Sequence, residues 1–150
     1  MKRKCGNGIR NKNRMTFKTS FCDPFKPDIV DWGEVDKEEV IEAFEGIAWT
    51  DLLKQMLNKS DSEIYYSPSF EVLNTKNQHS LAISVVGDPN TYEWYVFYKR
   101  PKVIKGFLGF SRKTDPAFLT NVTGQTKKDV LQYIQALLEE NHDLLDQKIK

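Results

Sequence analysis

The stretch that decides the fold is YEWYVFYK, residues 92–99, in which five of the eight side chains are tryptophan, tyrosine or phenylalanine. Aromatic and β-branched side chains favour extended backbone, so this stretch predicts a β-strand. Successive side chains of a strand point to opposite faces of its sheet. We expect one face to be turned toward the helices and to hold Trp94, Val96 and Tyr98. The other face, the outer face, is then expected to hold Tyr95 and Phe97.

Short strands separated by turn residues are predicted on both sides of this stretch. The other runs with strand character are residues 64–73, 80–86 and 103–111. Turns are expected at residues 87–90 and 100–102, because each contains a proline among polar or charged residues. Pro68 lacks an amide hydrogen, which favours an edge or bulged position for the first strand. Loops this short join consecutive antiparallel neighbours, so the sequence predicts a four-stranded antiparallel meander.

An amphipathic helix is predicted before the strands. Asp36 and Glu39 have the spacing of a capping box, in which each side chain accepts a bond from a backbone N–H at the helix start. Apolar side chains recur at helical spacing over residues 40–57, and acidic side chains occupy the opposite side. Gly46 interrupts this pattern, so we expect a kink or a break there, with Thr50 capping a second segment.

A last helix is predicted after the strands, starting at Thr126 with Asp129 three residues further on. Apolar side chains at a period of 3.6 residues continue as far as Leu145. The two helices and the meander each have an apolar face to bury, and packing both helices on one sheet face satisfies all three. The predicted fold class is therefore α+β: a two-layer αββββα domain with a four-stranded antiparallel meander and two helices packed on one face.

The N-terminal residues differ from the rest in charge and in pattern. Residues 1–22 carry seven Lys or Arg side chains and no acid, whereas the whole chain has a net charge of +1. Residues 1–14 are predicted to be a disordered basic arm, and residues 15–150 a single α+β domain. Two prolines rule out a continuous helix through residues 15–33. We expect that segment to be an extended strap whose aromatic side chains pack on the domain surface.

Length and composition are those of one globular domain. The chain has 150 residues, of which 39% are hydrophobic and 29% charged, which suits a folded domain rather than a disordered chain. No apolar run is long enough to span a bilayer. The first residues lack the apolar core of a secretory signal, so a cytoplasmic location is expected. Cys5 and Cys22 fit no metal or redox motif and are expected to be unpaired thiols.

Motifs of known enzyme chemistry are missing from the sequence. It contains no phosphate-binding glycine loop, no zinc-protease motif and no nucleophile elbow. His79 and His142, the two histidines, are interpreted as ordinary surface residues. The acidic row of Glu38, Glu42 and Glu45 is interpreted as the solvated side of a helix. We therefore predict that the protein is not an enzyme and that it holds no cofactor and no metal.

One group of residues combines positive charge with aromatic rings. Between residues 99 and 113 there are six cations and no acid: Lys99, Arg100, Lys102, Lys105, Arg112 and Lys113. Phe107, in the predicted fourth strand, is expected on the outer face together with Tyr95 and Phe97. Aromatic rings flanked by cations bind single-stranded nucleic acid through stacking and phosphate attraction. The alternative is that aromatic side chains of residues 15–33 cover these rings.

The candidate partner-binding residues are Tyr95, Phe97, Phe107, Lys99, Arg100, Lys102, Lys105 and Arg112. We expect the partner to be another protein. The chain would then be a non-enzymatic binding domain that uses the outer sheet face or the acidic first helix. It could be an inhibitor or immunity protein, a chaperone-like adaptor or a regulatory accessory. Single-stranded nucleic acid bound to the same sheet face is the alternative, and no membrane contact is expected.

Overall fold

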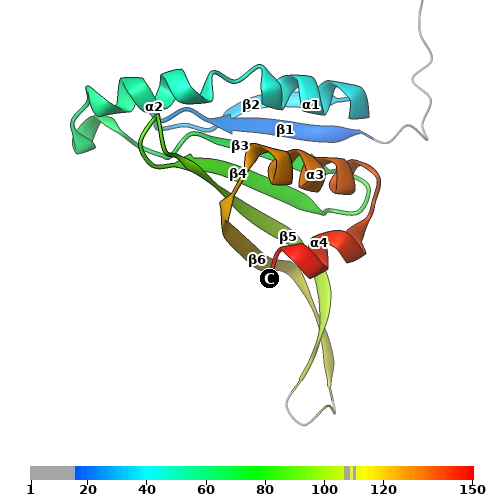
Figure 1. Ribbon diagram of the computed structural model, residues 1–150. Helices are drawn as coiled ribbons and strands as arrows, with labels where there is room; N and C mark the ends of the chain where they lie inside the picture. Colours follow the sequence, from blue (N-terminus) through cyan, green and yellow to red (C-terminus); the bar gives the residue numbers. More distant parts are fainter. Residues whose placement is uncertain (1–15, 107–108, 110) are drawn as a thin grey trace, which may run out of the picture.

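The computed structural model describes residues 16–106, 109 and 111–150 of the chain. It has the predicted α+β class but a larger sheet, with six antiparallel strands in the order β2-β1-β3-β4-β5-β6. The strands are β1 (Phe17–Cys22), β2 (Val30–Val35), β3 (Ser69–Asn74), β4 (Ser80–Val86), β5 (Glu93–Lys105) and β6 (Arg112–Gln125). The helices lie on one face of the sheet (Figure 1) and are α1 (Lys37–Glu45), α2 (Trp49–Leu57), α3 (Lys127–Leu138) and α4 (His142–Lys148). A short 3₁₀ turn, η1 (Asp61–Glu63), precedes β3.

The first two strands form a hairpin that extends the sheet, so the prediction of a surface strap over residues 15–33 is wrong. β1 pairs with β2 on one side and with β3 on the other, both antiparallel. Phe17 and Phe21 point to the helix side of the sheet and are buried there. The two prolines correctly excluded a continuous helix from residues 15–33. An extended segment, however, satisfies its backbone N–H and C=O groups best by pairing inside a sheet. The expected strap therefore does not cover the outer face.

The position of β3 also differs from the prediction. Because β1 pairs with β3 along its length, β3 is an internal strand and not an edge strand. Pro68 precedes the strand, so its missing amide hydrogen removes nothing from the ladder. Its carbonyl oxygen accepts a bond from the Val85 N–H at 3.3 Å. A proline just before a strand is thus compatible with an internal place in the sheet.

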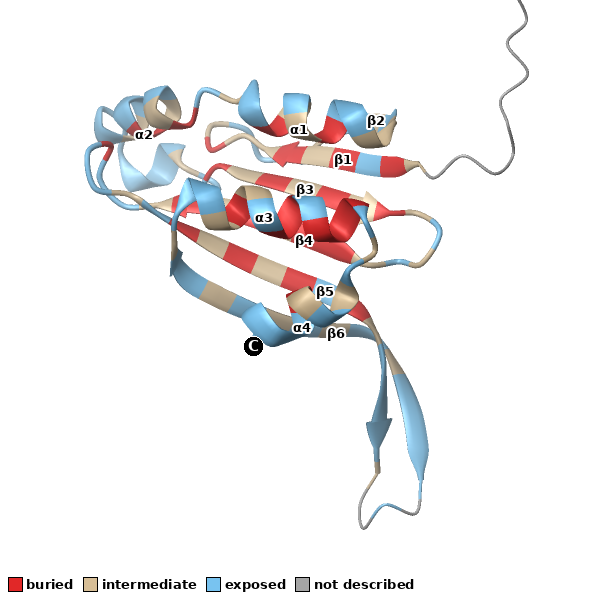
Figure 2. Ribbon diagram, turned by 45° about the vertical axis from the view of Figure 1, so that its right-hand side comes forward, coloured by how far each residue is buried: buried red, intermediate tan, exposed pale blue. Residues whose placement is uncertain are grey.

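β5 is longer than predicted, and β6 lies in residues 112–125, where the sequence predicts no strand. β5 runs through Pro101 as far as Lys105, so the turn expected at residues 100–102 is wrong, and residues 103–105 belong to β5 and not to a separate fourth strand. The pairing register with β6 shifts at Pro101, as at a β-bulge, which lets the strand accept a proline. Beyond this shift the two strands leave the sheet together (Figures 1 and 2). This projection, called the basic arm below, comprises residues 101–105 and 112–117.

The starts of two helices follow the predicted capping boxes. The Asp36 N–H donates to Glu39 Oε2 at 2.7 Å, and the Asp129 N–H donates to Thr126 Oγ1 at 3.2 Å. The expected break is also present, because α1 ends with Gly46 as its C-terminal cap. Local hydrogen bonding at helix ends involves residues close in sequence, which is why these features were predictable.

Two other helix boundaries were predicted wrongly. α2 begins at Trp49 with Ala48 in the cap position, so Thr50 lies inside the helix. The predicted last helix is two helices, α3 and α4. Glu140, with a φ of 57°, adopts the left-handed conformation that commonly ends a helix, and the chain then turns into α4. Leu145 is nevertheless buried, because α4 folds back onto the core.

The core lies between the sheet and the helices, and burial alternates along the strands (Figure 2). As predicted, Trp94, Val96 and Tyr98 are buried on the helix side. Tyr95 and Phe97 alternate to the outer face, where they are half-buried. Each bulky apolar side chain that is fully buried contributes about 1.5–3 kcal/mol to folding.

Some sequence predictions fall partly outside the described residues. The disordered N-terminal segment predicted over residues 1–14, which includes Cys5, lies outside them, as does Phe107. Cys22 lies within them and is a free cysteine. Among the helices that the structure describes, none combines the length and apolarity needed to cross a membrane.

Candidate binding surfaces

The outer face of the sheet carries the two aromatic rings predicted there, and the helices leave it open (Figure 1). Cross-strand pairing places Phe97 between Ala82 of β4 and Asn121 of β6, and Tyr95 beside Ser84 of β4. These neighbours have short side chains, and both rings are half-buried. The result is a pair of partly exposed aromatic side chains beside small or polar neighbours.

Leu119 of β6 extends this aromatic pair with an exposed aliphatic side chain. It is 55% exposed, and it pairs with Lys99 two residues along β5 from Phe97. Side chains two residues apart on a strand share a face, so Leu119 lies on the outer face near Phe97. Tyr95, Phe97 and Leu119 are called the outer patch below. Lys99 places a positive charge at its border.

The basic arm brings cations from both of its strands together. Lys105 pairs directly with Arg112, and Lys113 follows next on β6. Like charges opposite one another destabilise a strand pair, so an anionic partner would stabilise this end of the arm. Among the described arm residues the one acid is Asp115, which pairs with Lys102.

The basic arm is exposed on both of its faces. Val103 is 59% exposed and Ile104 38%, although neighbouring residues of a strand point in opposite directions. The Lys102 ammonium lies 4.8 Å from the centre of the Phe118 ring, a cation–π contact at the base of the arm. The arm is thus joined to the domain at its base, by this contact and by the two strands that continue into the sheet.

Arg100 is set apart from the other predicted site residues. It alternates to the helix side of β5, where it is 4% exposed. Its Nη2 lies 2.5 Å from Asp146 Oδ1 of α4, and its Nη1 donates to Thr120 Oγ1 at 2.6 Å. The guanidinium also lies over the Tyr98 ring, 4.2 Å from its centre. Arg100 thus joins α4 to the sheet and does not belong to the exposed group of cations.

The two histidines form a stacked pair that sequence reasoning missed. The ring of His79, in the β3–β4 turn, lies 3.9 Å from that of His142 at the start of α4, with 19° between the planes. His79 Nδ1 is 2.7 Å from Tyr98 Oη. Burial, followed by the charge of His142, lowers the pKa of His79 to about 4. His79 is therefore neutral at pH 7.

The position of the histidine pair indicates a structural role. Asn77 Nδ2, in the same turn as His79, donates to Glu140 Oε1 at 3.3 Å, so polar contacts also join the turn to the end of α3. Within the part of the chain that the structure describes, no group of three or more His, Cys, Asp and Glu side chains could hold a metal ion. The pair meets only after α4 folds back, so nothing local in the sequence signals it.

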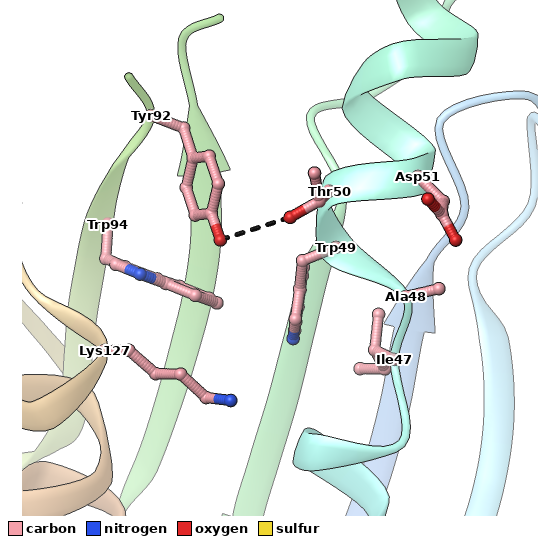
Figure 3. Close-up of a pocket in the computed structure, with 8 residues that line it drawn as sticks. All are labelled: Ile47, Ala48, Trp49, Thr50, Asp51, Tyr92, Trp94 and Lys127. Atoms are coloured by element: carbon pink, nitrogen blue, oxygen red, sulfur yellow. Dashed lines mark hydrogen bonds between the residues drawn. The ribbon is translucent and has the colours of Figure 1, made fainter. Parts of the chain in front are cut away.

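A small hollow of about 240 Å³ lies between α2, β5 and the start of α3 (Figure 3). The hydroxyls of Thr50 and Tyr92 are 3.4 Å apart across it. The rings of Trp49 and Trp94 meet edge to face at 5.0 Å, and Lys127 extends beside them (Figure 3). Ligand pockets usually measure about 300–1,000 Å³, so this hollow is smaller than a typical site.

A larger groove of about 440 Å³ lies on the other side of the α1–α2 junction. β1, β2, α1 and α2 line it, and Ile47 and Ala48 line both this groove and the small hollow. Two of its aromatic members, Phe21 and Trp32, belong to the segment predicted to be a strap, so sequence reasoning did not find it. Neither histidine lines the hollow or the groove.

Comparison with known proteins adds no relative to this description. The chain was compared with protein-family models, with curated proteins and with solved structures, and none of them matches it. Function is therefore inferred from the surfaces of this chain alone.

Proposed function

We propose that this chain is a non-enzymatic protein-binding domain, of an inhibitor, immunity, adaptor or regulatory-accessory type, that acts in the cytoplasm. The observation that carries the proposal is the outer patch: Tyr95, Phe97 and Leu119 lie together on a sheet face that the helices leave open. Aromatic side chains are enriched at the centre of protein interfaces, where a few of them supply most of the binding free energy.

The cations beside the outer patch favour a partner with an acidic rim. Lys99 borders the patch, and the adjoining basic arm carries Lys102, Lys105 and Arg112. Cations at the rim of an interface chiefly raise the association rate and select partners of opposite charge. We therefore expect added salt to weaken binding mainly through slower association.

A capture experiment with a matched control tests the proposal. The tagged chain and the variants Phe97→Ser and Leu57→Ser are each used to purify partners from native lysate at physiological salt. Leu57 serves as the control because it is an apolar residue of α2 that is 66% exposed. We expect a stoichiometric protein with the wild type and with Leu57→Ser, and about tenfold less with Phe97→Ser. Recovery of no protein, or equal recovery with both variants, would contradict the proposal.

A second candidate function is binding of single-stranded nucleic acid, which the basic arm favours. The arm carries cations on both strands and begins four residues beyond Phe97 on β5. Stacking of bases on aromatic rings, combined with attraction of phosphates to a positive surface, is how such strands are held without sequence preference.

Fluorescence anisotropy with a labelled single strand of about 20 nucleotides tests this second function. We expect an affinity that falls steeply as salt rises, and loss of binding in the double variant Lys102→Glu/Lys105→Glu. Leu57→Ser should bind as the wild type does. Binding that ignores salt, or no binding at about 50 mM salt, would exclude this function.

A further inference from the structure

The groove beside α1 has the size and the lining of a binding site, and it shares no residue with the outer patch. Its volume of about 440 Å³ lies within the range of ligand pockets. The residues that line the groove belong to β1, β2, α1, α2 and the α1–α2 junction, at the β2 edge of the sheet. The basic arm leaves the sheet at the opposite, β5–β6 edge (Figures 1 and 2). Its lining includes Phe21, Trp32, Ala43, Ile47 and Leu52.

The aromatic wall of the groove is held in place by packing and yet remains accessible. Trp32 stacks on Phe21 with 5.3 Å between ring centres and 20° between planes, and its ring lies 6.0 Å from that of Phe70. Trp32 is nevertheless 39% exposed, which is unusual for an indole that contacts core side chains. A ring supported on one side and open on the other offers apolar surface to a ligand at little entropic cost.

One acidic side chain, Glu42, lines the groove. It belongs to an acidic stretch of the sequence, residues 31–45, which carries seven acids against one cation. Part of this charge is neutralised, since Asp31 pairs with Lys18 at 3.0 Å and Glu45 with Lys127 at 4.0 Å. Glu42 has no ion pair with any described residue. An apolar groove with an unpaired carboxylate is complementary to an apolar group that carries a positive charge next to it.

We propose that this groove binds a segment of a partner polypeptide in which a bulky apolar side chain stands next to Lys or Arg residues. The apolar side chain enters between Trp32 and Leu52, and a neighbouring cation pairs with Glu42. The groove is open to solvent, so a side chain can enter it while the backbone that carries it stays outside. The site is separate from the outer patch, and the two can be tested independently.

Three short peptides test the chemistry of the site. The probes are Lys-Phe-Lys-Leu-Lys-Phe, the same peptide with Glu in place of Lys, and the same peptide with Ser in place of Phe and Leu. Binding to the whole chain is followed by NMR shifts of the Trp32 indole and the Ala43 amide. We expect the first peptide to bind about tenfold or more tightly than the other two. Equal binding of the Lys and Glu peptides, or shifts confined to the outer patch, would overturn the proposal.

Charge reversal on α1 tests the position of the site. Glu42→Lys and Glu45→Lys change the net charge equally and lie on the same helix, but Glu45 does not line the groove. We expect Glu42→Lys to weaken the first peptide about tenfold or more, and Glu45→Lys to weaken it less than about threefold. Ala43→Phe, which fills the groove without altering charge, should also abolish binding. Equal loss with both charge reversals would assign the effect to diffuse charge and overturn the proposal.

Two further outcomes separate this site from the other surfaces. Phe97→Ser should leave binding of the peptide unchanged, because it alters only the outer patch. Loss of peptide binding in this variant would overturn the proposal that the groove binds the peptide. Sedimentation of the intact chain tests whether a second copy fills the groove with its basic arm. If the chain forms oligomers and both Glu42→Lys and Lys102→Glu abolish them, a second copy of the chain occupies the groove. The proposal of a separate partner is then wrong.

Discussion

The two halves of β5 have the same extended backbone and the same alternation of side chains, yet they differ in burial. In residues 93–100, every second side chain is buried under the helices. In residues 101–105, by contrast, Val103 and Ile104 are both exposed although they point in opposite directions. Alternation along a strand therefore becomes burial only where a second layer covers the sheet. We expect substitutions of the buried side chains in the first half to lower stability, and substitutions in the second half to leave stability nearly unchanged.

The largest expected effect tests the two faces of the first half. Trp94→Ala removes a buried indole and should lower the free energy of unfolding by about 3–5 kcal/mol. Tyr95→Ala, on the outer face, should lower it by about 1 kcal/mol, because its ring is only half-buried. Urea unfolding followed by circular dichroism measures both. Equal losses would mean that a second layer covers the outer face as well.

The next effect compares two cations on either side of Pro101. Arg100→Met removes the bonds to Asp146 and Thr120 and should cost about 1–3 kcal/mol. Lys102→Met, at the base of the arm, should stay within about 0.5 kcal/mol of the wild type. Urea unfolding gives the two values, and faster hydrogen exchange in α4 should accompany only the first. A larger loss for Lys102→Met than for Arg100→Met would contradict the division of β5 into a half covered by helices and an exposed half.

A pH dependence is expected from the histidine pair under the first half of β5. The pKa of His79 falls from 6.5 to about 4, chiefly through burial and secondly through His142. Between these pH values the unfolded chain takes up a proton that the folded chain does not. The contribution of His79 to the free energy of unfolding is therefore fully present above about pH 6.5, and it is lost as the pH drops toward 4. Because the ring is partly exposed, the loss should be about 1 kcal/mol rather than the full value of the shift.

The matched measurement is urea unfolding of the wild type and of His79→Gln at several pH values from 7.5 downward. The variant keeps a polar side chain near Tyr98 but cannot take up the proton. We expect its stability to decline less between pH 6.5 and 4 than that of the wild type. Identical declines would show that His79 does not account for the dependence.

The smallest expected effect is in the arm. Val103→Thr keeps the branched shape and the strand preference of the residue while making its surface polar. Because Val103 is 59% exposed, the free energy of unfolding should change by less than about 0.5 kcal/mol. A shift of the urea midpoint corresponding to more than about 1 kcal/mol would mean that Val103 is packed against the domain.

Features that depend on neighbouring residues were predictable from the sequence. The capping boxes at Asp36 and Thr126, the break at Gly46 and the alternation of residues 92–99 all rest on contacts within a few positions. The outer-face positions of Tyr95 and Phe97 followed from the same alternation. These parts of the candidate site could be found because the strand itself was unmistakable.

Features that depend on distant residues were not predictable in this way. Pro101 reads as a turn residue, but pairing with β6 makes it part of a bulged strand. The sequence around Phe21 and Trp32 predicts a surface strap, but the pairing of β1 with both β2 and β3 places these residues in the sheet. Arg100 resembles its basic neighbours in the sequence, but β5 continues through it and turns its side chain to the helix side, where it contacts Asp146.

The sequence by itself thus determined the α+β class, two helix starts, a helix break and the facing of the aromatic strand, because period and capping act locally. Only the tertiary structure decided that the sheet has six strands, that β5 and β6 project as an arm, and that a groove lies beside α1. These outcomes depend on which strands and helices meet, and such contacts join residues far apart in the chain. The open outer face and the acidic groove, both consequences of those contacts, are where a partner of this protein should be sought.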